Sequence, residues 1–222
     1  MVEYVKQWAR QTQGELNDEE RDLVAVSFKY QTGQRRAAWR VLSVIQKRES
    51  GKGAKQQADW IKEYKSVLEE ELVSACMGCL DLLTEFLIPN SQDVGKVFLY
   101  KMKGDYYRYL AEFSTGDKKN QNAQKAQQAY MDSLSLAKET ISPTHPWRLG
   151  LALNQSVFYY EIMQNPEKAL HMARQAFDDA IADLDQVEGD GKETTLIMQL
   201  IRDNVTLWTS ELMEQEAAAR QN

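Results

Sequence analysis

The sequence predicts an all-α fold, and three observations support that class. No stretch alternates with the period of two that marks a half-buried strand, whereas the segments between chain breaks have helical patterns. None of the four prolines falls in the interior of such a segment, beyond its first turn. Several segments exceed the roughly 11–12 residues of an average helix, which favours an elongated bundle of antiparallel helices.

Eight helices are expected in order along the chain. The first covers residues 1–13. Asn17, followed three residues later by Glu20, forms a variant of the capping box, so a second helix begins there and extends to about residue 48. The segment "ESGKG" at 49–53 ends it, and a third helix runs from about 53 to 88, before Pro89.

Five further helices complete the expected bundle. They cover residues 92–115, 119–140, 145–163, 166–186 and 192–215. Asn165 and Pro166 supply an N-cap and a proline at the first helical position of the 166–186 helix. The segment "VEGDGKE" at 187–193 is the most flexible internal loop by composition. No fixed-period repeat and no linker rich in Gly, Pro or Ser divides the chain into two domains.

Composition excludes several classes of protein. The 222 residues can bury one large core or two small ones, and the net charge of −6 argues against a general nucleic-acid binder. No apolar run approaches the length of a membrane span, and Met1 does not open a signal peptide. Cys76 and Cys79 form a lone C-x-x-C, and the chain has only two histidines, so we expect two thiols within one helix and no metal or other cofactor.

Two pairs of basic residues share one spacing. Lys29 and Arg36 are seven residues apart, as are Lys101 and Arg108, so each pair lies on one helix face, about 10.5 Å apart. If the two faces meet, Lys29, Arg36 and Arg108 can converge on a dianion, because guanidinium groups bind phosphate oxygens bidentately. Tyr109 can add a hydroxyl donor. The alternative is that each pair belongs to an ordinary solvated helix face.

Acidic residues near these cations are sparse. No Asp or Glu occurs between Lys29 and Arg40. Asp105 lies four residues after Lys101 and three before Arg108, so it could orient both cations without displacing a ligand.

Five blocks of the sequence closely resemble the 14-3-3 family: "RDLVAVSFKYQTGQRRAAWRVLSVI", "KVFLYKMKGDYYRYLAEF", "PTHPWRLGLALNQSVFYYEI", "AFDDAIADLD" and "TLIMQLIRDNVTLWTS". The resemblance covers residues 17–210. It implies one cup-shaped helical domain over 1–215, a short tail at 216–222, and a groove that binds phosphoserine or phosphothreonine segments of client proteins. The protein would then be a non-catalytic signalling adaptor in the cytoplasm, with the nucleus as a second compartment.

The resemblance also assigns roles by position. The residues that match the family's phosphate contacts are Lys29, Arg36, Arg108 and Tyr109. Those that match its peptide contacts are Lys101, Leu153, Asn154, Val157, Glu161, Leu200, Asn204, Leu207 and Trp208. Spacing independently places Asn154, Val157 and Glu161 on one helix face, and two amide side chains suit the main chain of a docked peptide. By pattern alone, however, plain core packing would be assigned to Leu153, Val157, Leu200 and Leu207.

The resemblance departs most at the start of the chain. The family opens with a helix of roughly twenty residues before the point that matches "MVEYVKQW", so eight of its nine helices are expected here. That helix normally packs on the partner subunit at positions matching Ala38, Leu42 and Tyr64. The family homo- or heterodimer is therefore expected to be weakened for this chain.

Two other classes of function remain as alternatives. One is a helical scaffold, and the other is an enzyme acting on phosphorylated substrates. A phosphatase needs a nucleophile or metal ions beside the phosphate, and the basic cluster contains neither. The adaptor is therefore the preferred prediction.

Overall fold

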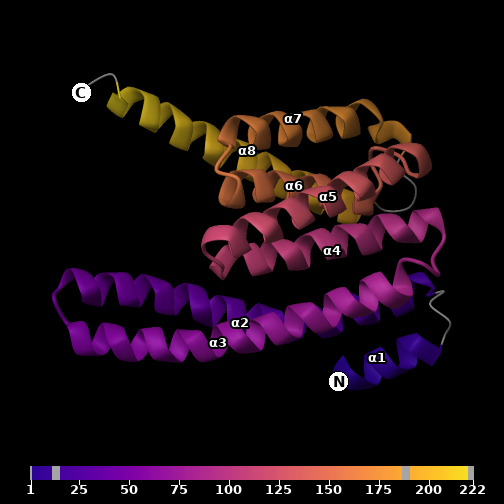
Figure 1. The fold of residues 1–222 in the computed structure, drawn as a ribbon. Coiled ribbons are helices and arrows are strands. Elements are labelled where there is room, and N and C mark those ends of the chain that lie inside the picture. The colour runs from indigo at the N-terminus through magenta and orange to yellow at the C-terminus, as the bar shows by residue number, and fades with distance from the viewer. Residues whose placement is uncertain (1, 12–15, 187–190, 220–222) are drawn as a thin grey trace. The chain divides into compact units, whose positions relative to one another are not determined.

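The computed structural model describes residues 2–11, 16–186 and 191–219. These residues form eight α-helices with short π and 3₁₀ turns and contain no strand, as the sequence predicts (Figure 1). The chain divides into two compact units. The first comprises residues 1–92 and 109–120, and the second comprises residues 93–108 and 121–222.

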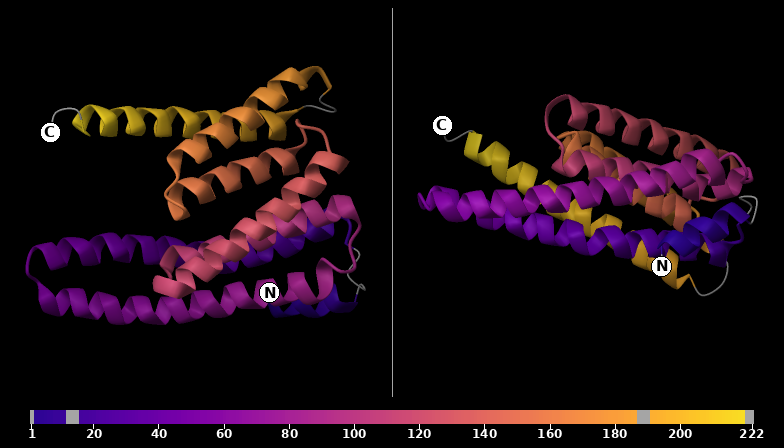
Figure 2. Two further views of the ribbon diagram at one scale, coloured as in Figure 1. Left: turned by 45° about the horizontal axis from the view of Figure 1, so that its top comes forward. Right: turned by 60° about the horizontal axis from the view of Figure 1, so that its bottom comes forward.

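The first unit is dominated by two long antiparallel helices. Here α2 (Asp18–Gly51) packs along α3 (Lys55–Leu82), and the shorter α1 (Val2–Gln11) packs on α2 (Figure 2). The turn between α2 and α3 uses Gly53 at φ +77°, a conformation that disfavours residues with a Cβ atom. Buried side chains such as Phe28, Leu72 and Cys76 form the core of this unit.

The expected capping box at the start of α2 is present. The Asn17 side chain accepts a hydrogen bond from the Glu20 amide at 3.0 Å, and the Glu20 carboxylate accepts one from the Asn17 amide at 2.8 Å. Two of the otherwise unpaired amide groups at the helix start are thereby satisfied. This local motif explains why the sequence located the helix start correctly.

Two helices are shared between the units. They are α4 (Asp93–Phe113) and α5 (Gly116–Thr140). Within the second unit, the Ser133 hydroxyl of α5 donates to the main-chain oxygen of Val97 in α4 at 2.7 Å. That bond joins the buried faces of the two helices.

Three helices complete the second unit: α6 (Pro146–Val157), α7 (Pro166–Ala182) and α8 (Lys192–Ala219), which pack against one another. Pro146 and Pro166 both occupy the start of their helices, a position that the sequence predicts for Pro166. The Asn165 side chain caps α7 by accepting from the Lys168 amide at 2.9 Å. His145 caps α6 in the same way, through its ring nitrogen and the Trp147 amide, and the sequence did not reveal this role.

Some helix ends differ from the expectation. The expected helices at 53–88 and 145–163 each finish in a π-helical turn, η1 (Leu83–Leu87) and η2 (Phe158–Ile162). The 166–186 helix ends at Ala182 and is followed by the 3₁₀ turn η3 (Leu184–Gln186), while α8 extends to Ala219 instead of ending near residue 215. Residues 12–13 of the first expected helix, and 187–190 of the loop predicted to be flexible, lie outside the described residues. The single domain predicted over 1–215 stays a prediction.

Candidate functional site

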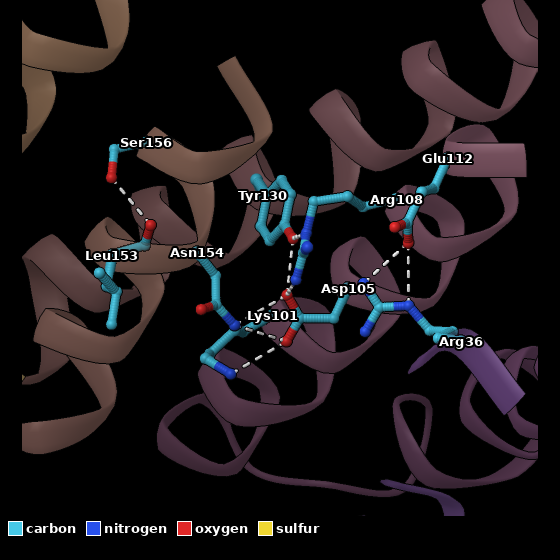
Figure 3. Close-up of polar contacts among 9 residues, drawn as sticks. All are labelled: Arg36, Lys101, Asp105, Arg108, Glu112, Tyr130, Leu153, Asn154 and Ser156. Atoms are coloured by element: carbon cyan, nitrogen blue, oxygen red, sulfur yellow. Dashed lines mark hydrogen bonds and ion pairs between the residues drawn. The ribbon is translucent and has the colours of Figure 1, made fainter. Parts of the chain in front are cut away.

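In the first unit, two arginines from α2 share one carboxylate of α4. Arg36 donates from Nε and Nη2 to Glu112 Oε2 at 3.0 and 2.8 Å (Figure 3), and Arg40 donates to the other oxygen, Oε1. The Arg36 guanidinium also stacks on the Tyr109 ring, with Cζ 3.6 Å from the ring centroid. Arg36 is thereby held in one orientation by a carboxylate and an aromatic face.

Glu112 remains ionised because of these arginines. Burial alone would raise the pKa of this carboxyl, but the Arg36 charge and the hydrogen bonds from Arg40 and Arg36 outweigh burial and lower it. One carboxylate thus serves two guanidinium groups, which leaves this cluster with an excess of positive charge. Sequence reasoning missed Glu112, because it lies far from Arg36 along the chain.

Lys29 differs from Arg36, although both are on α2. Its side chain is exposed, and no hydrogen bond or ion pair involving it is found in the part of the chain that the structure describes. It adds a further positive charge to the helix that carries Arg36, two turns away.

In the second unit, Asp105 is the centre of a buried polar cluster. It accepts from Lys101 Nζ at 3.0 Å and from Arg108 Nη2 at 3.2 Å, so the predicted role of Asp105 in orienting both cations is confirmed. Two neutral side chains complete the cluster (Figure 3). The Tyr130 hydroxyl donates to Asp105 at 2.6 Å, and Asn154 Nδ2 lies 2.9 Å from both carboxylate oxygens.

A further hydrogen bond links members of the cluster, and a glycine makes room for Tyr130. Arg108 Nε donates to the Tyr130 hydroxyl at 3.0 Å, so Tyr130 links the arginine to the carboxylate. A Cβ atom at Gly104 would lie 2.6 Å from the Tyr130 ring. Gly104 therefore allows the close approach of α5 to α4 that brings the hydroxyl to Asp105.

The electrostatics of this cluster favour an ionised Asp105. Burial would raise its pKa, but the charges of Lys101 and Arg108 and the hydrogen bond from Tyr130 more than compensate, so the pKa lies below its usual value. Burial raises the pKa of Tyr130 well above its usual range, which keeps this hydroxyl protonated as a donor. As in the first unit, one carboxylate serves two cations.

On α6, the residues predicted to contact a peptide are partly accessible. Asn154 uses its amide nitrogen for Asp105, while its Oδ1 makes no hydrogen bond with the described residues. Leu153 and Val157 are half-buried, and Glu161 is exposed within η2. The two apolar side chains are therefore less enclosed than the core residues of the same helix, such as Leu149 and Leu151.

On α8, the predicted residues fall into two groups. Leu200 and Leu207 expose 44% and 54% of their surface, which is unusual for core leucines, and Asn204 between them is half-buried. Trp208 is only 4% exposed and stacks on Tyr160, with ring centroids 4.6 Å apart. The Tyr160 hydroxyl in turn donates to Glu211, and this bond raises the Tyr160 pKa to about 12.

The residues predicted to receive a partner subunit are in the first unit. Ala38 and Tyr64 are exposed and Leu42 is half-buried. They are accompanied by exposed apolar residues on the same two helices, including Val41, Val44 and Trp60. Such an accumulation of apolar surface is typical of a protein–protein contact.

In 2–11, 16–186 and 191–219, no three His, Cys, Asp or Glu side chains are grouped as a metal ion would require. Cys76 and Cys79 are buried and form no disulfide, and burial raises the Cys76 pKa to about 12. No described helix is both long and apolar enough to cross a membrane.

Comparisons with known proteins identify the relatives of this chain. The family model for 14-3-3 proteins matches residues 1–209. The checkpoint signal transducer rad24 of Schizosaccharomyces pombe is 49% identical, over 100% of this chain and 83% of its own length. The 14-3-3-like protein GF14 epsilon of Arabidopsis thaliana is 51% identical, over 97% of this chain and 85% of its own. The 14-3-3 protein beta/alpha-A of Xenopus laevis is 51% identical, over 91% and 83% respectively.

Proposed function

The chain belongs to the 14-3-3 family, and from this premise we propose that the phosphate of a client is bound by Lys29, Arg36, Arg108 and Tyr109. Like its family, the protein is a non-enzymatic signalling adaptor that binds phosphorylated client proteins and forms dimers. The enzyme and scaffold alternatives find no support. We propose here which individual residues carry out that function.

The observation that carries the assignment is the Asp105 cluster. A buried carboxylate with cations on either side and two neutral donors fixes Lys101 and Arg108 before any ligand arrives. Immobilising a flexible side chain on binding costs roughly 0.5–1.5 kcal/mol, and a side chain that is already ordered avoids this cost. Because one carboxylate pairs with two cations, the cluster keeps a net positive charge. That charge can attract a phosphate group, whose own charge is about −1.5 to −2.

The Glu112 cluster supports the same role for Arg36. Arg36 is held between Glu112 and the Tyr109 ring, and its Nη1 makes no hydrogen bond with the described residues. Exposed Lys29 can move to meet a ligand, since nothing described restrains its ammonium group. A guanidinium group held in place together with a mobile lysine suits a phosphate ester.

Most of the peptide contacts that we propose lie on α6, the η2 turn that follows it, and α8, while Lys101 lies on α4. The unused Asn154 Oδ1 is an acceptor for a peptide amide, and a docked peptide needs such partners because an unmet buried group costs roughly 1–3 kcal/mol. The exposure of Leu200 and Leu207 supports apolar contact with client side chains. The other proposed contacts are Lys101, Leu153, Val157, Glu161, Asn204 and Trp208.

Dimer contact and compartment complete the proposal. Ala38, Leu42 and Tyr64, with the apolar surface around them, would contact the partner subunit. The cytoplasm is the proposed compartment, and the absence of a disulfide at Cys76 and Cys79 is compatible with its reducing conditions.

The assignment is tested by calorimetric titration with a phosphoserine peptide and its unphosphorylated twin. The wild type should bind only the phosphorylated form well. Arg36→Ala and Lys29→Glu should weaken that binding at least about tenfold, because each removes a charge-assisted contact. Lys47→Glu is the matched control, since Lys47 is also exposed on α2. Equal affinity for both peptides, or equal losses in Lys29→Glu and Lys47→Glu, would refute the assignment.

A further inference from the structure

A pocket lies in the second unit, and none of the residues assigned to peptide binding lines it. It has a volume of about 190 Å³ and is lined by parts of α5, α6 and α7. Most of its wall is apolar and includes Leu134, Leu149, Ala152, Met172 and Ala176. An apolar cavity with a few polar groups is the usual form of a small-molecule site.

The pocket and the proposed peptide contacts use opposite faces of α6. At about 100° per residue, Leu149, Ala152 and Gln155 fall within one third of the helix circumference. Leu153, Asn154 and Val157 are centred roughly 150° away from them. A ligand in the pocket would therefore not occupy the positions proposed for a client peptide.

Gln155 provides an unsatisfied polar group in the pocket wall. The residue is 2% exposed, and its Oε1 atom has no hydrogen-bond partner among the described residues. A buried acceptor without a partner destabilises a protein by roughly 1–3 kcal/mol. A ligand that brings an N–H or O–H group to Gln155 Oε1 would relieve this penalty.

The charged part of the pocket wall favours a negative charge. Lys138 and Arg148 line it, and Arg148 is held in place because Nη1 donates to the Ile141 main-chain oxygen at 3.0 Å. Asp179 also lines the pocket, but its carboxylate already accepts from Gln175 at 2.6 Å. Lys138 is exposed, and no ion pair involving it is found in the described part of the chain.

We propose that this pocket binds a small aromatic carboxylate that carries a ring N–H or O–H donor. The ring would contact the apolar wall, the donor would reach Gln155, and the carboxylate would lie beside Lys138 and Arg148. The volume of about 190 Å³ is below the roughly 300–1,000 Å³ of typical ligand pockets, so it suits one or two rings and not a nucleotide. This site is independent of the proposed phosphopeptide contacts.

The first test uses indole-3-carboxylate as the probe, followed by NMR of the full-length protein. We expect saturable shifts of the Leu149, Ala152 and Met172 methyl signals, with a Kd of about 2 mM or tighter for a ligand of this size. Indole lacks the carboxylate and 1-methylindole-3-carboxylate lacks the donor, so each should bind at least about fivefold more weakly. No saturable shift at these methyl groups, or equal affinity for all three compounds, would overturn the proposal.

Variants then test the assigned contacts. Gln155→Leu should remove the preference for indole-3-carboxylate over its N-methyl analogue, and Lys138→Glu should weaken the acid but not indole. Lys62→Glu is the control, because Lys62 is exposed and does not line the pocket. If Gln155→Leu fails to fold, Lys138→Glu still tests the proposal, because the Lys138 side chain is exposed and its replacement should not prevent folding. An unchanged affinity of indole-3-carboxylate for Lys138→Glu would contradict the assignment.

Discussion

The two clusters of cations and carboxylate differ in how they are built. Asp105 and its cations come from one helix, with spacings of four and three residues, and Tyr130 and Asn154 add neutral donors from α5 and α6. Glu112 instead receives both of its arginines from α2. The Asp105 and Arg108 side chains are 8% and 9% exposed, whereas Glu112 and its partners Arg36 and Arg40 are 13%, 17% and 50% exposed. We infer that Asp105 is the more rigid and the less replaceable of the two carboxylates.

The largest expected effect is that of Asp105→Ala. This change leaves two cations and two neutral donors without their shared acceptor in a buried position. Removing one partner of a buried ion pair typically destabilises a protein by about 3–5 kcal/mol. Urea unfolding should show a loss of this order.

Asp93→Ala is the matched control for that measurement. Asp93 pairs with Lys96 on the same helix, α4, but its side chain is 64% exposed. Exposed pairs contribute about 0–1 kcal/mol, so little change is expected. Similar losses in both variants would show that Asp105 has no special role.

Glu112→Ala should have a smaller effect, about 1–2 kcal/mol by the same urea measurement. It removes charge-assisted hydrogen bonds, but Arg40 can turn to water and Arg36 keeps its contact with the Tyr109 ring. If Glu112→Ala destabilises the protein more than Asp105→Ala does, the comparison between the two clusters is wrong.

Acid should reveal the Asp105 contribution in a predictable direction. Because folding lowers the Asp105 pKa, the carboxylate stabilises the protein fully above its unfolded pKa, roughly 3.9. That contribution is lost as the pH falls through the lower folded pKa, where Asp105 takes up a proton. The stability difference between wild type and Asp105→Asn should therefore be constant near neutral pH and shrink below about pH 4. A difference that grows on acidification would contradict the assigned charge state.

The smallest effect on stability is expected for Leu207→Lys, within about 0.5 kcal/mol, because Leu207 is largely exposed. Phosphopeptide affinity should nevertheless fall, since a charge would replace an apolar contact. Met213→Lys is the control on α8, as Met213 is also exposed and lies on another face of the helix. A stability loss of several kcal/mol in Leu207→Lys would assign this residue to the core instead.

The sequence could predict those features that depend on interactions between residues close together along the chain. Helix starts at Asn17 and Asn165 depend on neighbouring residues and were located correctly. The ion pairs of Asp105 lie within one turn of a helix and were also foreseen. The blocks of residues that resemble 14-3-3 proteins supplied the family, which the comparisons confirm.

Interactions between distant segments could not be predicted in this way. Tyr130 and Glu112 reach their partners only after the helices pack, so no spacing in the sequence indicates them. Gly104 gave no signal either, since its role depends on the Tyr130 ring of another helix. The burial of Trp208 against Tyr160 likewise depends on contact between η2 and α8.

We infer that the buried Asp105 carboxylate holds the cations in place for phosphate instead of competing for them. The most direct test is the affinity of Asp105→Asn for the phosphoserine peptide, measured by calorimetry beside Asp93→Asn. Competition predicts tighter binding, because the substitution removes a negative charge. Pre-orientation predicts weaker binding, by about three- to tenfold, because Lys101, Arg108 and Asn154 lose their fixed geometry. Unchanged or tighter binding by folded Asp105→Asn would contradict the account.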